Sequence, residues 1–105
     1  MFLLSALGCR LIAEPSVTLI NASPWPIEHG MLLVGPDKLW SGDLAPGERV
    51  ELRFAPERDA GFIVTGIVNG KPLNGTEQGY TTPGDHGGHV LRLDPDGSIH
   101  DVTVP

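Results

Sequence analysis

Glycine and proline interrupt this sequence so often that they decide which regular structure it can form. The chain holds 14 Gly and 10 Pro, and no stretch free of both exceeds eight residues. A helix interior loses about 1 kcal/mol at each Gly and about 3 kcal/mol at each Pro relative to Ala, and ordinary helices need about 10 to 12 residues. Short strands fit between the interruptions, so the sequence predicts an all-β chain.

The segments between the interruptions carry strand patterns. Residues 49–54 alternate between apolar and charged side chains, which is the period of a half-buried strand. Residues 62–68 are apolar on both faces, which favours a central position. Further strands are expected at 16–21, at 28–34 and 39–40 around a turn at 35–38, at 71–73 after the Asn69–Gly70 turn, and at 89–93 and 98–104 around a turn at 94–97. We predict a small antiparallel β-sandwich of about 7–8 strands.

Length and composition indicate one folded domain, expected over residues 10–105. Hydrophobic residues make up 40% and charged residues 19% of the chain, as in ordinary globular proteins. The formal net charge is −6, and the basic residues are scattered. Such a surface repels phosphate backbones, so nucleic-acid binding is disfavoured.

Residues 1–9 support two interpretations. They are apolar and end with Gly8 before Cys9, the one cysteine of the chain, which is similar to the end of a bacterial lipoprotein signal. No basic residue precedes Cys9, and Ala6 stands where such signals usually have leucine. One interpretation is a signal whose start lies upstream, with Cys9 as the lipidation site and the only membrane attachment. The other is a first strand with a buried free thiol.

Two motifs extend the fold prediction. Residues 17–24 form an early strand that stops at an Asn and is followed by a short loop. Residues 42–48 contain a Leu-x-Pro-Gly-Glu turn that leads into the strand at 50–54. Together with residues 61–65, they resemble the pattern of bacterial immunoglobulin-like modules in surface and periplasmic proteins. The resemblance covers about residues 16–68 and concerns the fold. It implies an immunoglobulin-like sandwich that serves as an extracytoplasmic scaffold or adhesion-type module, and it carries over no catalytic residue.

Two groups of side chains are candidates for a binding site. Asp85 and His86 are adjacent, and two glycines separate them from His89. The three side chains have the ligand chemistry of a zinc, copper or nickel site; the alternative is a polar loop. Trp25 and Tyr80 fall in or near predicted loops, where aromatic faces contact sugars or protein partners; the alternative for Trp25 is that it caps the core.

No pattern points to catalysis or to a cofactor. The sequence has no Gly-x-Ser-x-Gly motif and no pair of carboxylates suited to acid and base roles. We therefore expect a noncatalytic binding or structural module of the bacterial cell envelope or periplasm, with a protein or a surface polymer as partner. The alternatives are a metal-binding protein that uses Asp85, His86 and His89, and a cytoplasmic interaction domain.

Overall fold

The computed structural model describes residues 15–85 and 87–103. Every regular element in this part is a strand, so the prediction of an all-β chain is confirmed, while the expected 7–8 strands become nine. No helix among these residues is long and apolar enough to cross a membrane. The strands are β1 (Ser16–Asn21), β2 (Ile27–Val34), β3 (Asp37–Leu44), β4 (Arg49–Arg53), β5 (Ala60–Val68), β6 (Lys71–Pro72), β7 (Gln78–Thr81), β8 (Gly88–Leu93) and β9 (Ile99–Asp101).

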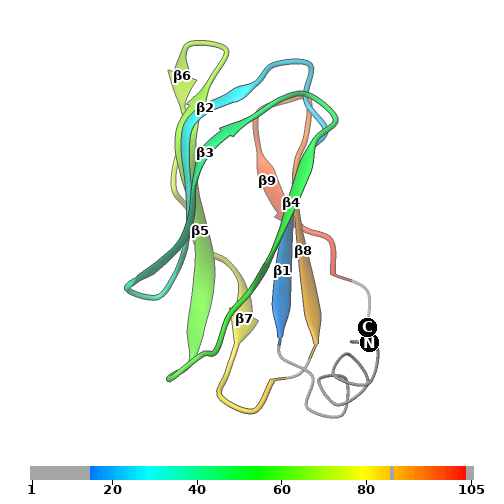
Figure 1. Cartoon of the computed structure of the whole chain (residues 1–105). Coiled ribbons are helices and arrows are strands. Elements are labelled where there is room, and N and C mark those ends of the chain that lie inside the picture. Colours follow the sequence, from blue (N-terminus) through cyan, green and yellow to red (C-terminus); the bar gives the residue numbers. More distant parts are fainter. Residues whose placement is uncertain (1–14, 86, 104–105) are drawn as a thin grey trace, which may run out of the picture.

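The strands form two sheets that face one another (Figure 1). One sheet has the order β4-β1-β8-β9, and the other has the order β3-β2-β5-β6, with β7 also paired to β5. The sheets are mostly antiparallel, but β1 and β8 run parallel. The predicted antiparallel arrangement is thus confirmed for the other strand pairs and is wrong for this one. Because β1 and β8 are far apart in the sequence, no hairpin fixes their relative direction.

Local turn chemistry explains the hairpins. Asn69 and Gly70 have φ angles of 53° and 75°, as a type I′ turn requires, and β6 returns antiparallel to β5 as predicted. The turn between β2 and β3 is shorter than the predicted 35–38. Only Gly35 and Pro36 lie between the paired residues Val34 and Asp37, because Gly35 takes a positive φ of 56° and closes a two-residue turn.

The strand that the sequence did not predict is β7. It is four residues long, it includes Gly79 at a φ of 71°, and it lacks an alternating apolar pattern. Its pairing comes from the start of β5, where Ala60 lies opposite Thr81 and Phe62 lies opposite Gln78. A strand that forms because its neighbour offers hydrogen-bond partners has no clear strand pattern in its own sequence.

The core lies between the two sheets and draws on both. Leu19 and Leu91 from one sheet and Leu32 and Phe62 from the other are fully buried, and each such side chain stabilises the fold by about 1.5–3 kcal/mol. In β4 the predicted alternation is confirmed, with exposed arginines and glutamate between half-buried apolar residues. The prediction that 62–68 is central is confirmed as well, since β5 has partners on both sides.

Asn21, at the end of β1, is completely buried and joins the two sheets at one end of the molecule. Its Nδ2 donates to the carbonyl oxygens of Leu44, at 2.9 Å, and Trp25, at 2.8 Å. Its Oδ1 accepts from the backbone N–H and the hydroxyl of Ser23, at 3.0 and 2.7 Å. The two hydrogens of Nδ2 and the two lone pairs of Oδ1 therefore all have hydrogen-bond partners.

The backbone of Asn21 holds the turn between β3 and β4. Its N–H donates to the carbonyl of Glu48, and its carbonyl accepts from Gly47. The turn itself has Pro46 followed by Gly47 at a φ of 83°, with the Glu48 N–H donating to the Ala45 carbonyl, as in a type II turn. The segments 17–24 and 42–48, which were singled out as separate motifs, thus contact each other.

Replacing Asn21 with Ala should lower the free energy of unfolding by about 3 kcal/mol, because several buried donors and acceptors lose their partner at once. Urea denaturation followed by circular dichroism measures this loss. Asn74→Ala is the matched control: Asn74 is exposed and makes one local bond to the Thr76 N–H, so its variant should stay within about 0.5 kcal/mol of the wild type. Equal losses for the two variants would contradict the structural role of Asn21.

Candidate functional site

The structure places the predicted site residues at opposite ends of the molecule. Trp25 follows the end of β1, whereas Gly88, next to His89, pairs with Ser16 at the start of β1. Tyr80 lies in β7 at that second end and is 61% exposed. Cys9 and His86 lie outside the described residues. Trp25 and Tyr80 therefore do not share a surface.

At the second end, Asp85 organises a small polar cluster. Its Oδ2 accepts from the Thr81 hydroxyl at 2.8 Å and from His89 Nε2 at 2.6 Å, and its Oδ1 accepts from the Gly87 N–H at 2.9 Å. The Gly87 N–H, together with the His89 and Thr81 side chains, lowers the pKa of Asp85 to about 2. Because an ionised carboxylate can only accept, His89 carries its hydrogen on Nε2.

The His89 ring fastens this cluster to the core. Its centroid lies 5.1 Å from that of Phe62 and 6.3 Å from that of Phe54, and the two phenylalanine rings meet edge to face at 5.6 Å. The Asp85–His89 pair thus ties the loop before β8 to two aromatic side chains of the core. The Asp85–His89 pair therefore stabilises the fold, whether or not it also binds a ligand.

The sequence suggested that these residues ligate a metal. Asp85 and His89 do lie together, but both Asp85 oxygens and His89 Nε2 are already occupied by protein partners. Within residues 15–85 and 87–103, no group of three or more His, Cys, Asp or Glu side chains is arranged to hold a metal ion. The third residue of the predicted set, His86, lies outside the described residues.

A groove runs along one side of the molecule, where the edges of the two sheets meet. One wall is the segment from Pro72 to Gln78, which includes Asn74 and Thr76, and the other is the β8–β9 turn with the start of β9, from Asp96 to His100. The hollow between them measures about 500 Å³. A second hollow of about 260 Å³ continues it to Trp25 and Lys71 and shares lining residues with the first. We call the two together the edge groove.

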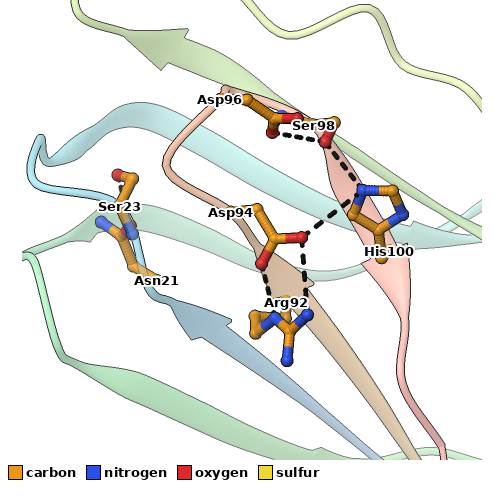
Figure 2. Close-up of polar contacts among 7 residues, drawn as sticks. All are labelled: Asn21, Ser23, Arg92, Asp94, Asp96, Ser98 and His100. Atoms are coloured by element: carbon orange, nitrogen blue, oxygen red, sulfur yellow. Dashed lines mark hydrogen bonds and ion pairs between the residues drawn. The ribbon is translucent and has the colours of Figure 1, made fainter.

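Hydrogen bonds fix the β9 wall of the edge groove (Figure 2). The Ser98 hydroxyl lies 2.6 Å from Asp96 Oδ1 and 2.8 Å from His100 Nε2. Asp94 accepts from Arg92 Nε at 2.5 Å and lies 3.4 Å from His100 Nε2. Hydrogen bonding to Ser98 lowers the pKa of Asp96. The predicted turn at 94–97 is closed by the Gly97 N–H, which donates to the Asp94 carbonyl, and Gly97 has a positive φ of 90°.

Ser98, His100 and Asp94 bring together the residue types of a hydrolytic triad, but the geometry differs from one. In a triad the serine and the carboxylate bind opposite nitrogens of the imidazole, whereas here both lie next to Nε2. The carboxylate of Asp96 can only accept, so the Ser98 hydroxyl donates its hydrogen to Asp96 and accepts from His100. This direction stabilises the turn, and the His100 imidazole does not accept the hydrogen of the Ser98 hydroxyl as the base of a triad does.

Sequence reasoning did not find the edge groove. Its walls come from segments about twenty residues apart, and neither segment has an apolar or catalytic motif. The available signal was the concentration of amide and hydroxyl side chains in 74–78 and 96–100. Among the groove residues, Trp25 was named beforehand as a candidate for partner binding.

Asp85→Asn should destabilise the fold at neutral pH and remove part of its acid sensitivity. The pKa of Asp85 is depressed in the folded state, so its contribution is present above the ordinary value of 3.8 and is lost as the pH falls toward about 2. Urea denaturation at several pH values measures both effects, and Glu57→Gln, at an exposed position, is the control.

The same denaturation experiment with added zinc separates this structural role from metal binding. Stabilisation of the wild type by zinc, absent in Asp85→Asn, would identify the Asp85 cluster as a metal site. A wild-type acid transition identical to that of Asp85→Asn would contradict the role given to the carboxylate.

Comparisons with known proteins define the fold alone. No protein-family model matches the chain, and a search of curated proteins finds no match. Among solved structures, the chain is similar to the NMR structure of a protein from Eubacterium rectale, with a TM-score of 0.58 and 14% sequence identity. The similarity covers 86% of this chain and 87% of that chain, so the two proteins share the overall arrangement of strands.

Proposed function

We propose that this chain is a noncatalytic binding module of the bacterial cell envelope, built on an immunoglobulin-like β-sandwich. The observation that carries the proposal is the edge groove, a hollow of about 500 Å³ lined by amide, hydroxyl and imidazole side chains. Its size falls within the range of ligand sites, and polar groups that converge on a hollow are what such sites use for orientation and specificity.

The immunoglobulin-like part of the proposal is supported by the contact between the two resembling motifs. Asn21 and the Leu44–Glu48 turn are 23 residues apart in the sequence at their closest and are joined by the buried amide of Asn21. A motif whose two halves contact each other is a more specific feature than either half alone. Because a fold does not by itself determine a function, we infer the binding role from the edge groove.

The envelope part of the proposal rests on residues 1–9, whose apolar run ends with Gly8 and Cys9. Cleavage before Cys9 and attachment of a lipid there would leave a tethered module facing the envelope. The acidic surface, at a net charge of −6, suits a module held at a distance from anionic headgroups.

Expression from the native locus tests this proposal through the mass and the location of the protein. We expect the protein in the membrane fraction, with an intact mass that corresponds to cleavage before Cys9 plus a diacylglyceryl or triacyl group. An unmodified Met1 in the soluble fraction would contradict the envelope assignment.

The matched control separates lipid anchoring from binding through the groove. Purified Cys9→Ala protein, which cannot be lipidated, should still sediment with isolated envelopes of the source organism if the groove binds an envelope component. Adding His100→Ala, an exposed groove residue, should reduce that sedimentation. Sedimentation that depends on Cys9 alone would leave the groove without a role.

A further inference from the structure

Several of the side chains that line the edge groove are uncharged hydrogen-bonding groups. Asn74 and Gln78 each bring an amide, and Thr76 and Ser98 each bring a hydroxyl. The amides offer both donors and acceptors, and so do the hydroxyls. Such a surface matches a ligand that is itself rich in neutral donors and acceptors, of which the hydroxyl groups of a sugar are the clearest example.

One end of the groove holds an aromatic side chain in a fixed position. Trp25 lies between Pro24 and Pro26. Its carbonyl accepts from Asn21 Nδ2, and its N–H donates to the Ser23 hydroxyl oxygen. Its side chain is partly buried against the core and lines the hollow of about 260 Å³. Because these bonds fix the backbone and the indole packs against the core, the side chain loses little conformational freedom on binding. It offers an apolar face to the C–H surface of a pyranose ring.

The charge around the groove disfavours polyanions. Asp96 lies on the β9 wall, Asp94 beside it pairs with Arg92, and Asp101 follows in β9. Lys71 lies at the Trp25 end, and the chain as a whole carries a net charge of −6. Nucleic acids and phosphate-rich polymers would be repelled by this surface. A neutral ligand meets no such barrier.

The backbone around the groove offers little to an extended peptide. Strand addition relies on a row of main-chain hydrogen bonds along a free edge. The edge strand β9 has three residues, and β6 has two, of which Pro72 has no N–H. Recognition in the groove therefore relies on side chains and not on main-chain pairing. These side chains favour a sugar over a peptide.

We propose that the edge groove binds a neutral oligosaccharide, such as a segment of a surface polysaccharide, with Trp25 as the stacking platform and Asn74, Gln78 and Ser98 as hydrogen-bonding groups. The proposal rests on the proposed function and names the ligand class of that site. Because the two hollows of the edge groove share lining residues, one ligand can contact both.

The test is a titration of the ¹⁵N-labelled full chain with cellohexaose, chitohexaose and mannohexaose, followed by amide chemical shifts and tryptophan fluorescence. With at least one of these sugars, the amides of residues 74–78 and 96–100 should shift together and saturate. A pool of extended peptides is titrated in parallel.

Variants locate the site. Trp25→Ala should weaken binding by about tenfold or more, as for other truncated aromatic anchors, and Trp25→Phe should recover part of the affinity. His100→Ala removes an exposed side chain that holds the Ser98 hydroxyl, so it should weaken binding severalfold while the chain stays folded. Tyr80→Ala removes an exposed aromatic ring at the opposite end and should leave affinity unchanged.

The outcomes distinguish the two proposals. Saturable shifts in the groove with peptides but with none of the three sugars would overturn the ligand class and leave the binding module in place. If neither the sugars nor the peptides shift the amides of residues 74–78 and 96–100, the ligand class and the binding module would both be overturned. Sugar binding that is lost in Tyr80→Ala and retained in Trp25→Ala would also overturn the proposed site.

Discussion

The buried amide of Asn21 is the interaction on which the rest of the structure depends. The apolar contacts between the two sheets supply most of the stability, but they are not directional and tolerate small displacements of one sheet over the other. The amide is directional: it joins the end of β1 to the carbonyl that ends β3 and to the loop that precedes β2. Because each of these groups would be costly to bury alone, the amide fixes how the sheets meet.

The placement of Trp25 follows from this contact, since the bonds that bury Asn21 also hold the Trp25 carbonyl. At the other end, His89, which is hydrogen-bonded to Asp85, closes the core by packing against Phe54 and Phe62. Both ends are thus closed by polar clusters with structural tasks. The side on which β9 faces the segment 72–78 is left open, and this geometry is why the groove, and neither terminal loop cluster, carries the proposed function.

The parts of the fold that depend on neighbouring residues were predictable from the sequence. The alternation at 49–54, the Asn69–Gly70 turn and the glycine-closed turn at 94–97 are local and were confirmed. The parallel pairing of β1 with β8, the strand β7 and the groove depend on residues far apart in the sequence, so no local pattern reveals them. For the same reason, Asp85 and His89 were found as neighbours, while their contacts with Thr81 and Phe62 were not.

Native-state hydrogen exchange tests most directly whether Asn21 locks the two sheets into one unit. The informative amides are those of Asn21, Ala22 and Gly47, which donate to Glu48, Leu93 and Asn21 respectively across this end of the molecule. If Asn21 keeps the two sheets together, these amides exchange only through global unfolding. Their opening free energy is then the same as that of the Leu91 and Val64 amides in the core strands. Exchange of the three amides by a much cheaper local opening, with the core strands still protected, would contradict the account.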